Sequence, residues 1–477
     1  MKARTLPGAI AALFPPAEER ARIGTWLNGE LEGALQRVQA GPVTPTVDME
    51  KFRAELAGFD FAAPQPLEDA LRWSIGQMQQ GIVQMANPRY FGLFNPGANF
   101  PAQCADRIAG LFNPQLASSA SSPVPVALEA HVIQALIRRA AFTVPATGHF
   151  ATGGSEANYT ALLCALTQGH KQFAADGVRA YPGPVRFYTS GDCHIAWLKI
   201  AHQAGVGRAA LRLVDTDGQG RMSPNALRAA IAEDRAAGAV PVMIVATAGT
   251  TGGGMIDPLH ACADIAQENS LWLHIDAAWG GAALASNRLR GLLSGIERSD
   301  SITIDAHKWL ATTMGCAIFI TTHGPVLSEA FHASTSFMPS SISGVDPYLN
   351  SVQWSRRFLG LRLFLALAAA GWDGLGAHVE RGVEVIAHIK KRLAAKGWKI
   401  ANDSPLAVLD VIPPPEMGDV RALVRGVVGS GRAWVAPTVF EGQDVVRICV
   451  TNGETSARDV DELIAALNDP ACRPAAR

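Results

Sequence analysis

A series of short apolar runs in the middle third of the chain constrains the possible folds more than any other feature. Helix-like segments lie between several of them. The clearest helix spans 223–237, with Ser223 at the N-cap, Pro224 at the first helical position and Gly238 just past the end. Strands separated by helices of about 10–15 residues are typical of βαβ units, so we expect an α/β fold with a mainly parallel sheet. The runs are VRFYTS (185–190), LRLVDT (211–216), PVMIVATA (241–248), LWLHIDAA (271–278), SITIDA (301–306) and CAIFITT (316–322).

The segments on either side of this region indicate further domains. At 477 residues the chain is too long for one small core. Helix formers dominate the first ninety or so residues, whereas the C-terminal part mixes helical and strand-like segments in the manner of a small α+β domain. A linker is expected at about 370–377, within AGWDGLGA. The expected division is a helical segment over 1–90, a large α/β domain over 91–372 and a small α+β domain over 373–477.

Composition excludes several classes of protein. A net charge of −1 with 17% charged residues argues against nucleic-acid binding and against a membrane-surface role. The uncharged stretch 238–256 contains Pro241 and a run of glycines, so it is not expected to span a membrane. The N-terminal apolar patch is broken by prolines, and no secretory signal is expected. The 7 cysteines form no CxxC pair, which favours free thiols in a reducing cytoplasm over disulfides or a metal site.

One lysine stands alone in the central region. The chain holds 41 Lys and Arg residues, but Lys308 is the only lysine between Lys199 and Lys390. It follows the apolar run SITIDA within DAHKW (305–309). An amine can lose its proton and attack a carbonyl carbon, which arginine cannot do at usable pH. Lys308 is therefore a candidate nucleophile, although an ordinary strand-end lysine that reaches solvent would also fit this pattern.

A glycine–serine turn precedes another predicted helix. In FATGGSEANYTALL, the residues Gly153, Gly154 and Ser155 come just before helix formers. Backbone N–H groups at such a turn, with the helix dipole behind them, form an anion cradle suited to phosphate. Such turns are also common in proteins that bind no phosphate.

Polar residues lie at the ends of three other predicted strands, where open α/β sheets collect their ligands. His194 follows the first of these strands, Thr247 lies near the tip of the second, and Asp276 ends the third. A structural histidine and a helix-capping or arginine-binding acid are the alternatives. Taken in order, however, a phosphate cradle, a histidine, an acid and a lone lysine are what pyridoxal 5′-phosphate requires. The phosphate needs donors, the aldehyde needs an amine, and the ring nitrogen needs a fixed carboxylate.

At these residues the sequence resembles the group II pyridoxal-phosphate-dependent amino-acid decarboxylases, which include the aromatic-amino-acid and glutamate decarboxylases. The resemblance covers roughly residues 50 to 465. The matching segments are NPRYFGLF (87–94), SSP (121–123), GGSEAN (153–158), CHIAWLK (193–199), TAGTT (247–251), LHIDAAWGG (273–281), DAHKW (305–309), NSVQWSRRF (350–358) and VVRICVTN (445–452).

The resemblance implies a fold, a reaction and a set of site residues. The fold is that of the PLP-dependent transferases (fold type I), whose large domain has a mainly parallel seven-stranded sheet. The reaction is decarboxylation of an L-amino acid to an amine and CO2, by a homodimer with shared active sites. By this resemblance, Lys308 forms a Schiff base with the cofactor, and Asp276 pairs with the ring nitrogen. His194 stacks on one face of the ring, Ala278 packs on the other face, and Thr247 lies beside the ring. The implied phosphate contacts are Gly154, Ser155 and His307.

Two departures from the family pattern concern the site. Asp305 stands where well-known members have an asparagine that donates to the phosphate, and an ionised carboxylate cannot donate. We therefore expect Asp305 to turn toward an N–H group or a cation. The family's loop tyrosine, its proposed proton donor, aligns with Pro347, so Tyr348 is the nearest candidate in a mobile loop expected at about 334–348.

Other functions stay open at this point. A carbon–carbon lyase or an aldehyde-forming oxidative deaminase could use the same cofactor on the same fold. A non-catalytic nucleotide-binding protein could use the glycine turns, but the chain lacks a G-x-G-x-x-G directly after a predicted strand. The DAHKW and RRF segments favour the decarboxylase, that is, a PLP-dependent carboxy-lyase of amino-acid metabolism.

Overall fold

The computed structural model describes residues 10, 12–333 and 346–472. The chain forms two compact units. The smaller unit joins Met1–Tyr90 with Ala422–Trp434 and Glu454–Arg477, and the larger unit comprises Phe91–Arg421 and Val435–Gly453. The division into 1–90, 91–372 and 373–477 stays a prediction.

The larger unit is built on a 7-stranded sheet with the strand order β1-β7-β6-β5-β4-β2-β3. Neighbouring strands are parallel except at β7, which runs antiparallel to both β1 and β6. The expected α/β fold with a mainly parallel seven-stranded sheet is confirmed. The strands are β1 (Thr147–Ala151), β2 (Val185–Ser190), β3 (Leu211–Val214), β4 (Val240–Thr247), β5 (Trp272–Asp276), β6 (Ser301–Asp305) and β7 (Ala317–Thr321).

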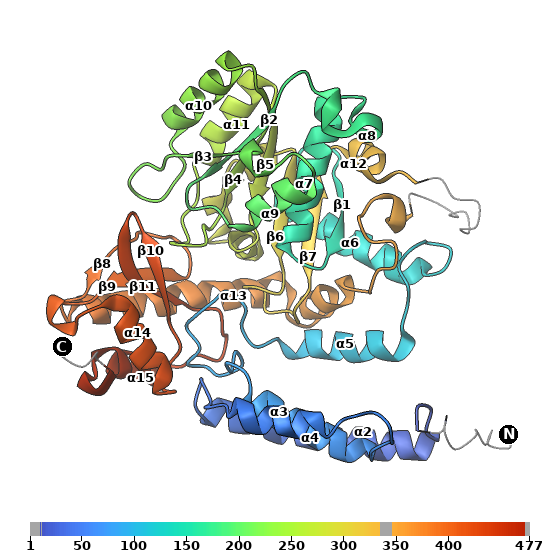
Figure 1. Cartoon of the computed structure of the whole chain (residues 1–477), viewed down its shortest axis with the longest axis vertical. Coiled ribbons are helices and arrows are strands. Elements are labelled where there is room, and N and C mark those ends of the chain that lie inside the picture. The colour runs from blue at the N-terminus through green and yellow to red at the C-terminus, as the bar shows by residue number, and fades with distance from the viewer. Residues whose placement is uncertain (1–9, 11, 334–345, 473–477) are drawn as a thin grey trace. The chain divides into compact units, whose positions relative to one another are not determined.

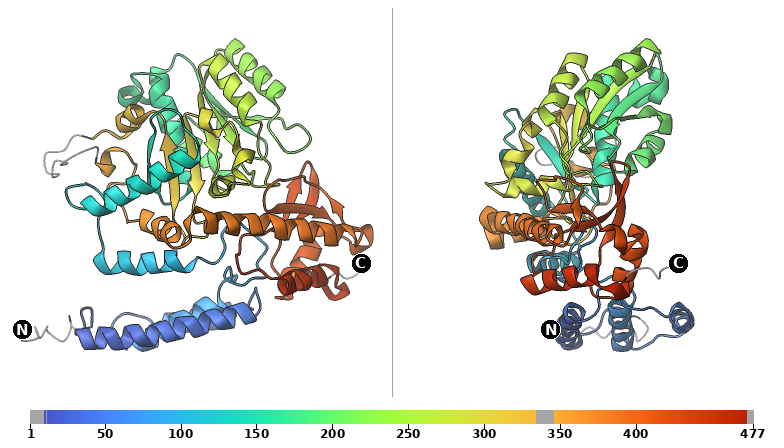
Figure 2. Two further views of the ribbon diagram at one scale, coloured as in Figure 1. Left: turned by 180° about the vertical axis from the view of Figure 1, so that it is seen from behind. Right: turned by 90° about the vertical axis from the view of Figure 1, so that its left-hand side faces the viewer.

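Helices cover both faces of this sheet. Figures 1 and 2 show α7 and α9 over one face and α6, α10 and α11 over the other. Because both faces are covered, β5, β6 and β7 are buried along their whole length, which explains their nearly continuous apolar sequences. The helices of this unit are α5 (Phe100–Phe112), α6 (Pro123–Arg139), α7 (Gly154–Gly169), α8 (Phe173–Asp176), α9 (Ala196–Gln203), α10 (Pro224–Ala236), α11 (Leu259–Asn269), α12 (Gly324–Phe331) and α13 (Gly360–Ala394).

Local signals in the sequence define several of these boundaries. β2 has the bounds predicted for it, and α10 begins at Pro224 as its capping pattern indicates. The Ser223 side chain accepts a hydrogen bond from the backbone N–H of Ala226, which satisfies one of the free donors of the first helical turn.

The larger unit also contains a 4-stranded antiparallel sheet with the order β10-β11-β9-β8. It includes the apolar segments LAVLDVI (406–412) and VVRICV (445–450), together with the strand that forms a hairpin with the second of them. The strands are β8 (Lys399–Ile400), β9 (Val408–Ile412), β10 (Ala436–Phe440) and β11 (Gln443–Cys449).

The segment expected as a linker, 370–377, lies within α13, and its role as a domain boundary stays a prediction. Gly371 has φ 64° and ψ −177°, a backbone conformation in which side chains other than hydrogen are strained, and it kinks the helix. The helix resumes after this one residue.

The smaller unit is helical, and helix formers dominate its first ninety or so residues. Asp48 caps α3 by accepting from the N–H groups of Glu50 and Lys51. In the part of the chain that the structure describes, every helix is too short or too polar to cross a bilayer. The helices of this unit are α2 (Ala17–Ala40), α3 (Met49–Ala57), α4 (Leu67–Gln80) and α15 (Ala457–Asn468), and the boundary between the units falls within α14 (Val420–Gly429).

A buried ion pair joins the segment after residue 346 to α6. Arg356 Nη2 lies 2.7 Å from Glu129 Oε2, and both side chains are 3% exposed. Burial raises the pKa of Glu129, and the Arg356 guanidinium acts against that rise. Arg356 also donates to the carbonyl of Phe150 at the end of β1. The neighbouring Arg357 is 60% exposed and lies 3.4 Å from its partner Asp106.

We expect Arg356→Met to lower the free energy of unfolding by about 3–5 kcal/mol, because the substitution leaves the Glu129 carboxylate buried without its counter-charge. The matched control, Arg357→Met, removes an exposed pair and should cost at most about 1 kcal/mol. Urea denaturation of both variants tests this. An Arg356→Met protein no less stable than the control would contradict the assignment.

Candidate active site

The register of the parallel strands brings reactive side chains to one edge of the large sheet. Thr247 at the end of β4 and Asp276 at the end of β5 are paired Cα neighbours. Asp305 ends β6, and a tight turn follows in which the N–H of Lys308 donates to the carbonyl of Asp305 at 3.1 Å. Because the carboxyl ends of parallel strands meet at the same edge, residues almost sixty positions apart face one space.

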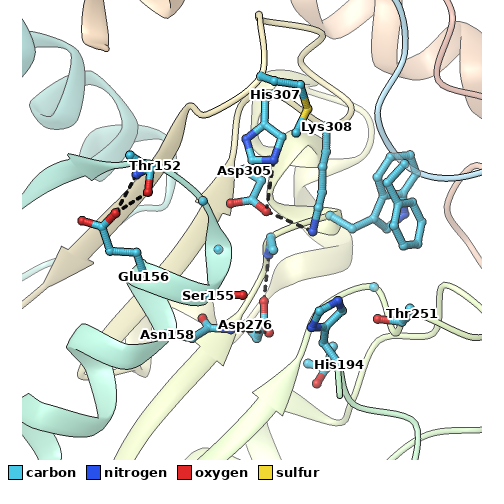
Figure 3. A pocket seen from close by; sticks show the side chains of 18 residues that line it. Thr152, Ser155, Glu156, Asn158, His194, Thr251, Asp276, Asp305, His307 and Lys308 are labelled. Carbon is cyan, nitrogen blue, oxygen red and sulfur yellow. Dashed lines mark hydrogen bonds and ion pairs between the residues drawn. The ribbon is translucent and has the colours of Figure 1, made fainter. Parts of the chain in front are cut away.

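That space is a cavity of about 330 Å³, within the range of about 300–1,000 Å³ usual for small-ligand sites. Figure 3 shows Lys308 and His307 on one side of it and Asp276 and His194 on the other. The structure brings ten of the residues singled out in the sequence to its wall: Gly153, Gly154, Ser155, His194, Thr247, Asp276, Ala278, Asp305, His307 and Lys308.

The Lys308 amine lies inside the cavity beside a carboxylate. Its Nζ is 3.0 Å from Asp305 Oδ2, and the two side chains are 21% and 3% exposed. The expectation that Asp305 turns toward a cation is therefore confirmed. The Phe94 ring, whose centroid is 5.7 Å from Nζ, borders the amine on another side. Behind Phe94 the rings of Trp279 and Trp309 are stacked, with centroids 4.5 Å apart.

Two neutral donors hold the Asp276 carboxylate. Asn158 Nδ2 donates to its Oδ2 at 2.8 Å, and the N–H of Ala278 donates to its Oδ1 at 3.1 Å. Asp276 is 5% exposed, so its direction is set by these bonds rather than by solvent. A carboxylate fixed at the end of a buried strand can bind a cationic ring nitrogen without first reorganising.

A chain of buried polar groups fixes Asn158 in turn. His274 Nε2 lies 3.0 Å from Asn158 Oδ1, and His274 Nδ1 lies 2.8 Å from Ser301 Oγ. Ser301 Oγ also accepts from Trp272 Nε1, so its own proton can go to His274 Nδ1. Burial lowers the pKa of His274 to about 4, which keeps this ring neutral. The neutral ring then carries its proton on Nε2 and donates to Asn158, which leaves the amide N–H free for Asp276.

The N-terminus of α7 forms the other end of the cavity. A Cβ atom placed on Gly154 would lie 2.8 Å from Asp305 Oδ2, so only glycine allows this close approach. A hydrogen bond orients the His307 ring, whose Nδ1 lies 3.0 Å from the carbonyl oxygen of Cys316. The Thr247 hydroxyl is buried at the cavity wall and has no hydrogen-bond partner among the described residues. These groups leave room and donors for an anion beside a helix N-terminus.

His194 lies after β2 on the open side of the cavity. Its Nδ1 accepts from the N–H of Ala196, which fixes the ring at the start of α9. The ring is solvent-accessible, yet the surrounding protein removes enough water to lower its pKa, while nearby Asp276 acts in the opposite direction. The ring is therefore neutral at neutral pH, as suits a group that stacks on a flat ligand.

Tyr348 does not line the cavity of this chain. Its ring lies 4.6 Å from that of Trp354, and its N–H donates to the carbonyl of Ala117. Most of the loop expected at 334–348 lies outside the described residues. The role of Tyr348 as proton donor stays a prediction, as do the roles of the other site residues.

Sequence reasoning missed several side chains of the cavity wall. Asn158, Phe94 and Trp279 all lie in segments that carry the family resemblance, but no role was assigned to them. Helical spacing could have found Asn158, because it follows Gly154 by four residues and therefore lies on the same face of α7. Phe94 and Trp279 carry no such signal, since aromatic residues beside glycines occur at many sites.

The cavity suits pyridoxal 5′-phosphate. It offers an amine, a fixed carboxylate, a helix N-terminus and an unsatisfied threonine hydroxyl, which match the aldehyde, the ring nitrogen, the phosphate and a ring substituent. Fold and site together define the class of pyridoxal-phosphate-dependent enzymes. The family whose sequence model is described as "Pyridoxal-dependent decarboxylase conserved domain" matches residues 60–405. The chain belongs to this family, and its cofactor is pyridoxal 5′-phosphate.

Known relatives agree with this assignment. The Bos taurus protein "Acidic amino acid decarboxylase GADL1" is 32% identical over 352 residues, which cover 72% of this chain and 65% of that protein. The Mus musculus "Cysteine sulfinic acid decarboxylase" is 34% identical over 319 residues, covering 65% of this chain and 64% of that protein. The crystal structure of mouse CSAD has a TM-score of 0.86 at 26% identity and covers 94% of this chain and 98% of that chain. The chain thus spans less than two thirds of the length of these two curated relatives.

We expect Lys308→Ala to lose all cofactor that borohydride can trap, because Lys308 carries the one amine that the described residues bring to the cavity wall. Mass spectrometry of the reduced protein measures the trapped cofactor. Lys199→Ala is the matched control, since Lys199 is exposed and lies in the same unit of the chain. Equal amounts of trapped cofactor in the two variants would show that Lys308 is not the residue that attaches the cofactor.

Proposed function

We propose that this protein is a PLP-dependent carboxy-lyase that converts an L-amino acid to the corresponding amine and CO2. The observation that carries the proposal is the shared cavity of Lys308, Asp276 and the N-terminus of α7. The names of the relatives, an acidic amino acid decarboxylase and a cysteine sulfinic acid decarboxylase, support the same reaction. Which amino acid this chain takes is left to experiment.

Some residues of the cavity are assigned to binding the cofactor, and others to keeping its ring nitrogen protonated. Lys308 would hold the cofactor through its amine. When bound, pyridoxal 5′-phosphate supplies an electron-accepting ring for the electrons of the broken bond. Asp276 keeps the proton on the ring nitrogen, and Asn158 and the N–H of Ala278 keep Asp276 in place. His194 would stack on one face of the ring, and Ala278 would pack against the other face.

The opposite end of the cavity holds the phosphate. Gly154 and Ser155 offer N–H groups and a hydroxyl at the start of α7, where the helix dipole favours an anion. His307 lies above them, and Thr247 borders the ring. Positioning of this kind holds the scissile carboxylate in one orientation, and exclusion of water from the cavity favours its loss.

We also infer that the protein is a cytoplasmic homodimer with shared active sites. Apolar side chains on α5 support a protein partner: Phe100, Leu111 and Phe112 are 72%, 80% and 75% exposed. Tyr348 is assigned to the shared site as the group that returns a proton to the substrate carbon. The cytoplasmic location rests on the 7 scattered cysteines of the sequence.

Product analysis tests the reaction. With the cofactor bound, a screen of the twenty amino acids should show one or a few that release CO2 and the matching amine in equal amounts. A carbon–carbon lyase would release an aldehyde without CO2, and an oxidative deaminase would release an aldehyde with ammonia or hydrogen peroxide. Either of these results would replace the decarboxylase assignment.

We expect Asp276→Asn to lower turnover by at least about 10²-fold, the scale on which a lost charge at a reacting centre acts. Cofactor content should fall much less, because a neutral amide keeps the shape but cannot hold the ring proton. Asp215→Asn, an exposed change of the same chemistry, is the control. The cofactor absorbance and the rate of CO2 release give the two readouts, and a rate equal to that of the control would exclude this role.

A further inference from the structure

Asp305 lies between the two groups that receive the cofactor. Its Oδ2 is 3.0 Å from Lys308 Nζ, and the same carboxylate fills the space over Gly154 at the N-terminus of α7. Asp305 is 3% exposed, and its Oδ1 has no hydrogen-bond partner among the described residues. One buried acid thus lies beside the amine assigned to the aldehyde and beside Gly154 at the helix end assigned to the phosphate.

These positions create a conflict of charge. A paired lysine is an ammonium ion, and an ammonium nitrogen has no free electron pair with which to attack an aldehyde. An ionised carboxylate only accepts hydrogen bonds and carries the same sign of charge as the phosphate beside it. Both obstacles disappear if one proton moves from the nitrogen to the carboxylate.

We propose that Asp305 accepts the proton of Lys308 when the cofactor is captured. The N–H bond breaks and leaves its electron pair on Nζ, while an O–H bond forms on Oδ2, so the charge of the pair stays at zero. The neutral amine would then be able to bond to the aldehyde carbon, whose oxygen would leave as water with the two protons that remain on Nζ. The neutral carboxyl group donates its O–H to a phosphate oxygen at the start of α7. Asp305 acts directly on the cofactor in this account, which rests on the cofactor assignment made for the active site and used in the proposed function.

Other ionisable groups face the same carboxylate. His307 Nε2 lies 3.8 Å from Asp305 Oδ2. The negative charge of Asp305 also acts to raise the pKa of His194 and of Cys316. Glu156 and Asp276 line the same cavity. Of these groups, Lys308 is the one at hydrogen-bond distance from Oδ2, and it must lose a proton for the cofactor to attach. It is therefore the proton donor that the geometry selects.

The test is a count of the protons exchanged when apoprotein binds pyridoxal 5′-phosphate, obtained by calorimetry in buffers of different ionisation enthalpy. Asp305→Asn should release about one proton more than the wild type, because the Lys308 proton has no internal acceptor. A second pair of proteins is Lys308→Ala and the double variant Lys308→Ala, Asp305→Asn. On binding the cofactor or inorganic phosphate, the single variant should take up about one proton more than the double variant. The protons of the phosphate itself cancel within each pair of proteins.

Controls separate this role from a structural one. Pyridoxal, which lacks the phosphate, should show no difference between the two proteins of the Lys308→Ala background. Asp264 is an exposed acid of the same unit, and the Asp264→Asn variant should exchange as many protons as the wild type. Asp305→Ser serves as a second neutral variant if the asparagine protein does not fold.

Equal proton counts within either pair overturn the proposal, even if the cofactor binds and the enzyme decarboxylates its substrate. If the wild type binds no borohydride-trappable cofactor, the cofactor assignment fails, and this proposal fails with it. The two failures are thus distinguishable by one absorbance and trapping measurement on the wild type.

Discussion

The parallel pairing of β4, β5 and β6 is the constraint on which the site depends. It sets Thr247 opposite Asp276 and ends β6 at Asp305, so that the turn bearing Lys308 begins at the same edge. Side chains alternate between the faces of a strand, and a slip of one residue would turn Asp276 from the cavity into the packing beneath α10 and α11. The burial of both faces by apolar side chains prevents such a slip. The chemistry of the cavity therefore depends on hydrophobic packing on which no reacting group acts directly.

Polar order extends from the cavity into the core. Ser301, His274 and Asn158 form a hydrogen-bonded series that ends on the Asp276 carboxylate. Each of these groups would be costly to bury alone, and each is satisfied by the next. The neutral state of His274 gives the series a single direction of donation, since the proton on Nε2 determines which end of the Asn158 amide faces the acid. A buried histidine thus orients a carboxylate that it does not touch.

The two acids of the cavity illustrate how surroundings divide roles between identical side chains. Asp276 accepts hydrogen bonds only from neutral donors, so its charge remains available to a cationic ligand. Asp305 already faces the cation of Lys308, and its charge is neutralised within the protein. Pairs of acids placed in such different environments are a recurrent means of assigning separate proton-holding tasks within one site. The proposed function uses the first acid as a fixed charge and the further inference uses the second as a proton acceptor.

The sequence by itself determined the α/β class, the bounds of strands such as β2, the cap of α10 and the lysine at the centre of the site. These features depend on local periodicity, capping and composition, which a chain carries without its neighbours. It also placed most of the cavity residues, since the strand ends of a parallel sheet converge by geometry. Only the tertiary structure decided that β1 joins the sheet beside β7, that α13 continues past Gly371, that Asn158 holds Asp276 and that Tyr348 packs on Trp354. Those outcomes depend on contacts between distant segments, and local propensity contains no information about which distant partner a residue meets.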